Sequence, residues 1–299
     1  MKWALVLSGG GAKGFAYIGM LRAFEALNVP EPDLIIGCSI GAVLGSMLAL
    51  GITNQEIERI FASDFDAEDY LGSGKVVPLK IVNRVLSFSS VFSNLLTSNC
   101  MDDGQKFYAL LQKITEGKSF SETKIPFVCN AVDLYTGEEV FIKDGELAKA
   151  VLASSAFPVA FPPVRMGNKL LVDGGLAHNT PVCFAREMGF EEIFAVTLDH
   201  FRPESFPEKY PSALSIMARV IACVFKNKEL QPEDYPSFWL DLSNTVSSAD
   251  FSHANELIRI GYIQTMQMKN EIKDFFSDSL SAHKARKKIR AKIEKEFKV

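Results

Sequence analysis

Residues 35–48 read Ile-Ile-Gly-Cys-Ser-Ile-Gly-Ala-Val-Leu-Gly-Ser-Met-Leu, and this stretch decides the fold class. A β-branched run leads into Gly37-Cys38-Ser39-Ile40-Gly41, and apolar residues at helical spacing follow it. A Gly-x-Ser-x-Gly segment between a strand and a helix is typical of a nucleophile elbow, a tight turn that exposes its serine. Side chains at the two glycine positions would clash within such a turn. Taken alone, the pentapeptide fits a nucleophilic Ser39 and an idle serine in a glycine-rich turn equally well.

Strands and helices are predicted to alternate along most of the chain. Short apolar runs predict strands at 3–7, 33–36, 125–132, 139–142, 169–172 and 193–198. Helical spacing predicts helices at 15–27, 42–50 and 147–155, and another that starts at about Pro181. Thr53 and Glu56 predict a capping box at the start of a further short helix. This alternation predicts an α/β fold, with a mainly parallel sheet and helices on both of its faces.

The chain of 299 residues suits one large α/β domain or slightly more. We expect residues 1–200 to form the catalytic domain and residues 201–299 to form a mostly helical extension packed on it. The irregular, partly helical pattern of 62–122 predicts an insert or lid. An apolar stripe over 86–96 could cover the site or dock on a membrane, although a helix packed on the core is the safer interpretation.

Composition argues against several classes of function. A formal net charge of −4 at pH 7 disfavours nucleic-acid binding by the whole molecule. Five scattered cysteines without metal-ligand spacing indicate a reducing compartment, and they predict neither a disulfide framework nor a metal site. The apolar run Met1–Leu7 is too short for a signal peptide, and no run of about 18 apolar residues predicts a membrane span. Cytoplasmic residence is therefore expected.

The last part of the chain has a different charge balance. Eight basic residues crowd 284–298, where Ile289, Ile293 and Phe297 recur at helical spacing. Such a helix could contact an anionic membrane surface, so a peripheral position at the inner membrane face is a further hypothesis. A solvated terminal helix docked by its apolar stripe explains the pattern equally well.

A second glycine-rich segment precedes the elbow. Residues 8–14 read Ser-Gly-Gly-Gly-Ala-Lys-Gly between the predicted strand 3–7 and helix 15–27. Backbone N–H groups in such a loop can converge at a helix start and stabilise an oxyanion, and Lys13 adds positive charge. The loop also matches the Gly-x-Gly-x-x-Gly pattern of dinucleotide sites. That pattern needs an acidic residue at the end of the second strand, whereas Asp33 lies at its beginning, so we favour the oxyanion loop.

A nucleophilic serine also needs a base. An ordinary α/β-hydrolase has several strands before its elbow and a histidine after it, whereas one predicted strand precedes the strand that carries Ser39. His178 is the best placed histidine, but a loop or helix-cap role suits it better. Asp173 ends a predicted strand before Gly174 and Gly175, and ligands gather at the carboxyl ends of strands in open α/β sheets. It could accept the proton as the carbon–oxygen bond forms; a structural turn aspartate is the alternative.

Three segments taken together resemble the patatin-like phospholipase family: 8–14, 37–41 and the turn Asp173-Gly174-Gly175. The run 153–163 is similar to the block before that family's aspartate, and 251–262 is similar to the C-terminal helix of its compact bacterial members. The resemblance covers about residues 3–200 and implies a three-layer α/β/α sandwich around a mainly parallel sheet. This chain has Asp-Gly-Gly where many members have Asp-Gly-Ala, and Lys13 where many have arginine. Neither difference removes a reacting atom.

The resemblance implies a dyad without histidine, in which Ser39 is the nucleophile and Asp173 the base. It implies an oxyanion hole formed by the amides of Gly10 and Gly11. The wider set of expected site residues comprises the loop residues Gly9, Gly10, Gly11, Lys13 and Gly14, and the elbow and turn glycines Gly37, Gly41, Gly174 and Gly175. No metal or cofactor is implied.

The implied activity is hydrolysis of lipid acyl esters, of the phospholipase A, lysophospholipase or esterase type. Phospholipids and lysophospholipids rank first as substrates, because the stripe over 86–96 and the basic tail could both face a membrane. The alternative is a catalytically weak, lipid-binding regulatory protein on the same scaffold. The sequence leaves the oligomeric state open.

Overall fold

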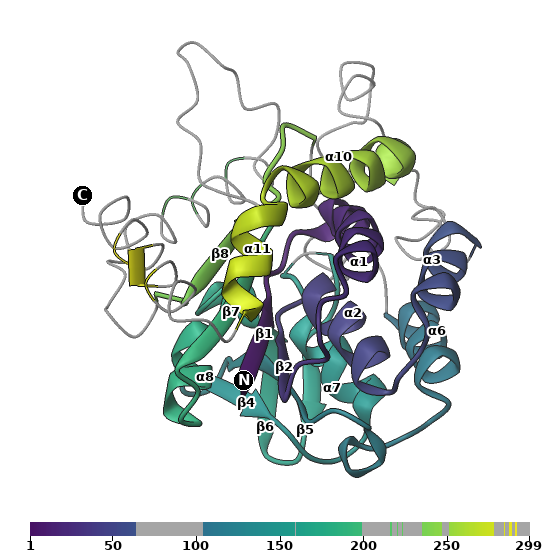
Figure 1. The fold of residues 1–299 in the computed structure, drawn as a ribbon. Helices are drawn as coiled ribbons and strands as arrows, with labels where there is room; N and C mark the ends of the chain where they lie inside the picture. Colours follow the sequence, from purple (N-terminus) through teal and green to yellow (C-terminus); the bar gives the residue numbers. More distant parts are fainter. Residues whose placement is uncertain are drawn as a thin grey trace.

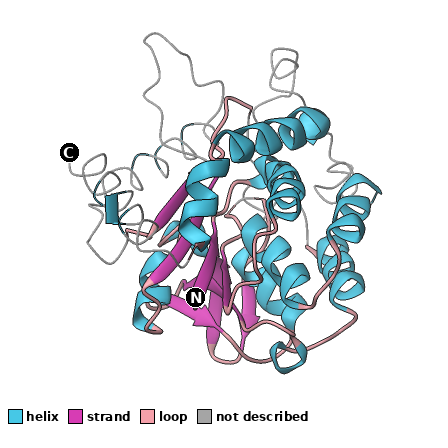
Figure 2. Cartoon of the chain, viewed as in Figure 1, coloured by secondary structure: helices cyan, strands magenta, loops and turns pink. Residues whose placement is uncertain are grey.

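An eight-stranded β-sheet organises the chain in the computed structural model (Figure 2). The structure describes residues 1–63, 104–158, 160–198, 235–246 and 251–277, with a few isolated positions over 216–223 and 284–291. The strands are β1 (Trp3–Leu7), β2 (Leu34–Gly37), β3 (Phe127–Asp133), β4 (Glu139–Ile142), β5 (Val164–Met166), β6 (Lys169–Asp173), β7 (Glu192–Thr197) and β8 (Phe238–Asp241). Their order is β5-β6-β3-β2-β1-β7-β8, and β4 also pairs with β3.

The sheet is mainly parallel, as the sequence predicts. β3, β2, β1, β7 and β8 are parallel neighbours in that order. β4 and β6 run antiparallel to β3, and β5 runs antiparallel to β6. The α/β fold class is therefore confirmed, with an antiparallel section at one side of the sheet.

Helices cover both faces of the sheet (Figure 1). The α-helices are α1 (Phe15–Leu27), α2 (Ile40–Ala49), α3 (Asn54–Ser63), α6 (Gln105–Thr115), α7 (Leu147–Ser154), α8 (Val182–Glu187), α10 (Ala254–Gln267) and α11 (Lys269–Phe276). Alternate residues of β1 point to opposite faces, because side chains alternate along a strand. Leu5 and Leu7 join the large core cluster with α1, α2 and α7, whereas Ala4 and Val6 pack with residues of α8.

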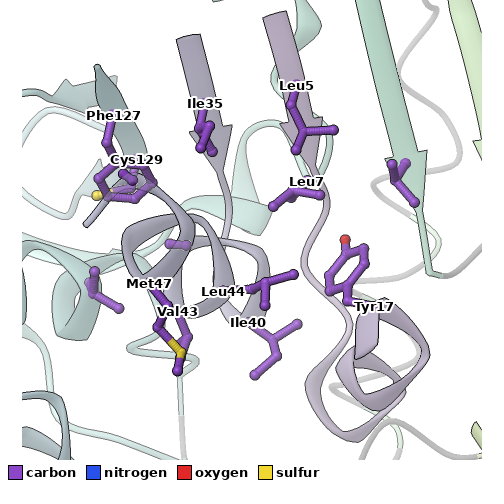
Figure 3. Close-up of a cluster of buried hydrophobic side chains, with 14 of the residues drawn as sticks. Leu5, Leu7, Tyr17, Ile35, Ile40, Val43, Leu44, Met47, Phe127 and Cys129 are labelled. Atoms are coloured by element: carbon purple, nitrogen blue, oxygen red, sulfur yellow. The ribbon is translucent and has the colours of Figure 1, made fainter. Parts of the chain in front are cut away.

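The larger core cluster lies between the sheet and α2 (Figure 3). Leu5 and Ile35 project from the neighbouring strands β1 and β2 toward this helix. Val43, Leu44 and Met47 of α2 are fully buried in the same cluster. This packing anchors α2 directly behind the turn that carries Ser39.

α1 and α10 approach one another unusually closely (Figure 1). A Cβ added to Gly19 would overlap with the backbone of Ile258, and one added to Gly261 would overlap with the backbone of Ala16. Glycine at these two positions lets the helix backbones touch. The C-terminal helix α10 is thereby fixed to the helix that follows the glycine-rich loop.

Most predicted elements occur within one or two residues of their expected bounds. The capping box at α3 is present: the Glu56 carboxylate accepts the Thr53 N–H, and the Thr53 hydroxyl accepts the Glu56 N–H. The sequence did not predict β5 or β8. β8 pairs with β7, so the C-terminal third supplies a strand to the central sheet.

Two predicted surface segments cannot be compared in full. The stripe over 86–96 lies outside the described residues. Of the basic segment 284–298, the described side chains of Lys284, Lys287 and Lys288 are exposed. Within the described parts of the chain, no helix is both long enough and apolar enough to cross a membrane.

Candidate active site

Ser39 lies at the sharp turn between β2 and α2. Its backbone has φ 52° and ψ −121°, a conformation that a residue with a side chain adopts only under strain. A Cβ on Gly37 would lie 2.6 Å from Ala42 Cα, and one on Gly41 would lie 2.6 Å from the carbonyl oxygen of Ser8. Both flanking positions therefore require glycine, and the turn is a nucleophile elbow with Ser39 half-buried at its tip.

The elbow is held from the side by α7. The backbone N–H of Ser39 donates to the hydroxyl oxygen of Ser154, the last residue of α7, at 3.0 Å. Ser154 is fully buried, so this hydrogen bond is shielded from water. The bond fixes the peptide plane just before the strained residue.

Asp173 reaches the elbow by a route that differs from the prediction. The sequence analysis expected the carboxyl ends of parallel strands to gather the site, but β6 runs antiparallel to β3. β3 continues beyond the end of β2: Gly37 pairs with Cys129, and Asp173 pairs with Ala131, two residues further along. β6 thus returns along the overhang of β3 and ends close to the level of Ser39.

The carboxyl group of Asp173 is enclosed by the protein. Its Oδ1 accepts the Gly175 N–H at 2.8 Å, and the Cys38 thiol lies 3.8 Å from the same oxygen. Its own N–H donates to the Ala156 carbonyl at 3.0 Å. Burial raises the pKa of Asp173 from 3.8 to about 6, against the lowering effect of hydrogen bonds from Gly175, Ser39 and Cys38. Asp173 is therefore a stronger base than an ordinary carboxylate, and the Ser39 side chain is one of the groups that influence its pKa.

Cys38 precedes Ser39 but has a different environment. Its side chain is fully buried beneath the turn. Burial, together with the charges of Asp173 and Glu139, raises the pKa of the Cys38 thiol well above its ordinary value of 9. Because a thiol reacts as the thiolate, Cys38 is unsuited to be a nucleophile and acts as a weak donor to Asp173.

The glycine-rich loop passes directly beside Ser39. A Cβ on Gly9 would lie 3.2 Å from Ser39 Cβ. The loop is fixed through Ser8, whose carbonyl accepts the Tyr17 hydroxyl at 2.7 Å and whose hydroxyl accepts the Leu198 N–H at 3.0 Å. The short helix η1 (Gly11–Gly14) follows, with Lys13 buried in it.

Several backbone donors lie near this elbow. Gly10 and Gly11 are half-buried, and within the described residues no hydrogen bond to their N–H groups is found. The N–H of Ile40, the residue after Ser39, is likewise without a partner there. Gly14 packs against the Ile40 side chain, where a Cβ would overlap with it. The loop thus contributes two unpaired N–H groups near Ser39, and the start of α2 contributes a third.

Comparisons with known proteins identify the family of this chain. The family model described as Patatin-like phospholipase matches residues 5–185. The chain belongs to the patatin-like phospholipase family.

Relatives of this chain include much longer proteins. Patatin-like phospholipase domain-containing protein 7 of Rattus norvegicus is 27% identical over 286 residues, which cover 87% of this chain and 20% of that protein. Patatin-like phospholipase domain-containing protein 6 of Homo sapiens is 24% identical over 285 residues, which cover 87% of this chain and 20% of that protein. Lysophospholipase nte1 of Emericella nidulans is 27% identical over 73% of this chain and 13% of its own length. The chain thus spans a small part of these relatives.

The fold is also similar to a solved structure. VipD from Legionella pneumophila superposes with a TM-score of 0.53 at 15% sequence identity, and the match covers 90% of this chain and 66% of VipD. The similarity supports the fold.

A second polar cluster lies behind the Asp173 turn. His178 Nδ1 lies 2.6 Å from Glu139 Oε2, and Asn130 Nδ2 donates to Glu139 Oε1 at 2.7 Å. The ligand atoms of Glu139, His178 and Cys183 lie within 4.8 Å of one another, so these three residue types could together hold a metal ion. The hydrogen bond between Glu139 and His178 accounts for two of them without a metal.

Three polar residues at the site were not predicted. Ser154 lies in the segment quoted for its family resemblance, without a role, and Asn130 interrupts a buried strand. Asn179 follows the Asp173 turn and contacts the glycine-rich loop. A buried polar residue within an apolar run is the sequence signal that could have found Asn130. The partners of Ser154 and Asn179 come from distant segments, which no local pattern indicates.

Proposed function

We propose that this protein hydrolyses acyl esters of lipids, with Ser39 as nucleophile and Asp173 as base. The observation that carries the proposal is the position of Ser39, at the tip of a strained elbow, beside the buried carboxyl group of Asp173, whose pKa is raised to about 6. The strained elbow and the neighbouring glycine loop support it. Membership of the patatin-like phospholipase family and the lysophospholipase relatives support the lipid ester as substrate.

The first half of the reaction would acylate Ser39. The Ser39 Oγ attacks the ester carbonyl carbon while its proton passes to Asp173, and a tetrahedral oxyanion forms. The intermediate collapses, the ester C–O bond breaks, and protonated Asp173 returns the proton to the leaving alkoxide. A base and acid with a pKa near 6 suits both proton transfers at neutral pH.

The second half would release the acyl chain. Asp173 takes a proton from water as the water oxygen attacks the acyl carbonyl. The new tetrahedral intermediate then expels Ser39 Oγ, which regains its proton from Asp173. The products are a carboxylic acid and the free enzyme, with no metal or cofactor in any step.

The oxyanion of both intermediates needs preorganised donors. We assign this role to the N–H groups of Gly10 and Gly11, with the N–H of Ile40 as a third donor that follows from the elbow geometry. Loss of one such donor costs about 10²–10³-fold in kcat in a serine hydrolase. Gly9, Lys13 and Gly14 shape the loop that presents these donors.

Lysophospholipids and phospholipids are the substrates that we rank first. Phe157 is 37% exposed and directly follows Ala156, whose carbonyl holds Asp173. An apolar side chain beside the dyad suits an acyl chain better than a polar substrate. Peripheral contact of the basic C-terminal segment with an anionic membrane remains part of this proposal.

A fluorophosphonate probe and a substrate panel test the function together. The probe should label the wild-type protein at Ser39, and Ser39→Ala should abolish both labelling and ester hydrolysis. The panel compares one-chain phospholipids, two-chain phospholipids and short esters. If Ser39→Ala retains hydrolysis, the nucleophile is misassigned. If the wild type binds lipid vesicles but hydrolyses none of the panel, the lipid-binding regulatory alternative is correct.

A further inference from the structure

Asn179 holds both backbone polar groups of Gly9. The Gly9 N–H donates to the Asn179 carbonyl at 3.1 Å, and Asn179 Nδ2 donates to the Gly9 carbonyl at 3.3 Å. Asn179 therefore bonds to both the N–H and the carbonyl of Gly9, although it lies 170 positions away in the sequence. Because Gly9 has no side chain to pack, its position is fixed by these two bonds, one to the backbone and one from the side chain of Asn179, together with the bond from the Ser8 hydroxyl to the Gly9 carbonyl at 3.0 Å.

The side-chain oxygen of Asn179 faces the other half of the site. Asn179 Oδ1 lies 3.9 Å from the Cys38 sulfur, which in turn lies 3.8 Å from Asp173 Oδ1. The same oxygen lies close to two glycines. A Cβ added to Gly175 would lie 3.1 Å from both Asn179 Oδ1 and Asp173 Oδ1, and a Cβ added to Gly9 would lie 2.5 Å from Asn179 Oδ1. The Asn179 amide thus fills the space between the glycine loop, Cys38 and the Asp173 turn.

The loop that carries Asn179 is itself anchored. Asn130 is fully buried on β3, and its Nδ2 donates to the His178 carbonyl at 2.8 Å and to the Gly174 carbonyl at 3.2 Å. Glu139 accepts a third contact from the same amide at 2.7 Å. Asn179 therefore projects from a fixed segment, so it can act as a rigid support.

We propose that Asn179 is a positioning residue that sets the oxyanion loop in register with the Ser39–Asp173 dyad. The inference rests on the proposed function, because it assigns a role within that site. Gly9 immediately precedes the proposed donors Gly10 and Gly11, so a displacement of Gly9 moves those N–H groups. Oxyanion stabilisation depends on donors that are already in place when the charge develops, which is why a support outside the reacting atoms matters.

Asn179→Ala should therefore lower kcat by about 10–10²-fold and leave KM close to the wild-type value. The split follows because the oxyanion exists in the transition state and not in the bound substrate, so the lost stabilisation appears in kcat. The rate of inactivation by a fluorophosphonate, which also passes through an oxyanion, should fall in parallel.

Asn179→Asp gives a second readout that a merely structural role would not move. The aspartate keeps the size of asparagine but replaces the donor to the Gly9 carbonyl with a carboxylate oxygen. It also adds a negative charge across Cys38 from Asp173, in a region that already contains Glu139. A like charge raises the pKa of a carboxyl group, so the acid limb of the pH–rate profile should shift to higher pH.

The experiment compares wild type, Asn179→Ala, Asn179→Asp and Asn244→Ala, using a short p-nitrophenyl ester, a fluorophosphonate and thermal unfolding. Asn244 is a matched control: it is also half-buried and bridges backbone groups, donating to the Leu242 carbonyl at 3.3 Å and accepting the Val246 N–H at 3.0 Å, at the end of β8.

A kcat loss confined to the two Asn179 variants, with the shifted acid limb in Asn179→Asp, supports the inference. Wild-type kcat in Asn179→Ala, or an equal loss in Asn244→Ala, overturns it. If the wild type itself is neither labelled nor active, the proposed function fails instead.

Discussion

At the residue scale, the surroundings of Asp173 raise the pKa of its carboxyl group and also fix its orientation. A base needs a pKa near the working pH, whereas an aspartate in water has a pKa of about 3.9. Burial of Asp173 raises its pKa to about 6, and the hydrogen bond from the Gly175 N–H orients the carboxylate. The glycine after it is essential for this arrangement, since a Cβ on Gly174 would overlap with the Asn130 amide. The proposed dyad therefore does not need the histidine that usually supplies a pKa near neutrality.

The pH dependence of hydrolysis should report this carboxyl group. We expect kcat/KM to rise with pH through about 6 and then to level off, because Asp173 must be ionised to accept the Ser39 proton. A pH–rate profile of the wild type with a short ester measures the midpoint. A profile that is flat from pH 4 to 8, in a protein that stays folded, would exclude Asp173 as the base.

Asp173→Asn should abolish most turnover and yet stabilise the fold at pH 8. Because the pKa of Asp173 is higher in the folded protein than in the unfolded chain, ionisation of Asp173 favours unfolding. This loss in the free energy of unfolding is complete above pH 6 and disappears below about pH 4, and it amounts to about 3 kcal/mol at most. Denaturant unfolding of both proteins at pH 4 and pH 8 measures the difference. Equal stabilities at pH 8 would mean that burial of the carboxylate carries no such penalty.

At the element scale, the site depends on contacts between elements that are far apart in sequence. The end of α7 serves both members of the dyad: the Ser154 hydroxyl accepts the Ser39 N–H, and the Ala156 carbonyl accepts the Asp173 N–H. A short segment thus fixes the backbones of the proposed nucleophile and the proposed base relative to each other. Its family-like motif was visible in the sequence, but its role was not, because both partners lie more than fifteen residues away along the chain.

Ser154→Ala should lower both stability and kcat. The substitution removes the acceptor of the partly buried Ser39 N–H, which costs about 1–3 kcal/mol, and it relaxes the strained elbow. Ser155→Ala is the matched control, because the Ser155 hydroxyl is also buried but has no hydrogen-bond partner within the described structure. Thermal unfolding and ester kinetics of the two variants should separate them. Similar losses in both would show that the Ser154 hydrogen bond is not the cause.

At the scale of the whole molecule, local sequence patterns predicted the individual elements better than they predicted which strands pair with each other. The elbow, the glycine loop and the Asp173 turn are each coded within a few residues, and so are β1, β2 and α1. The antiparallel course of β6 depends on the overhang of β3 beyond β2, which no local pattern indicates. β8 was missed because its four residues carry no alternation strong enough to stand out in a region with helical composition. Its place beside β7 is set by tertiary packing.

The C-terminal elements share an aromatic core with the catalytic sheet. Phe275 of α11 is fully buried, with ring centroids 5.6 Å from Phe194 on β7 and 5.5 Å from Phe238 on β8. Trp3 on β1 packs against Phe276 at 4.9 Å. The helix α11 therefore packs on β7, β8 and β1, the strand that leads into the glycine-rich loop, and we expect it to unfold together with the sheet.

Phe275→Ala should destabilise the entire molecule by about 3–5 kcal/mol, because it opens a cavity between α11 and the sheet. Unfolding followed by tryptophan fluorescence and by loss of fluorophosphonate labelling should give the same lowered midpoint, since Trp3 and Ser39 belong to one cooperative unit. Ile263→Ala on α10 is the control, since Ile263 is 41% exposed and its truncation should change stability by no more than about 0.5 kcal/mol. Two separate transitions in Phe275→Ala would instead mean that the C-terminal helices form an independent unit, and the packing of α11 would then not support the elbow.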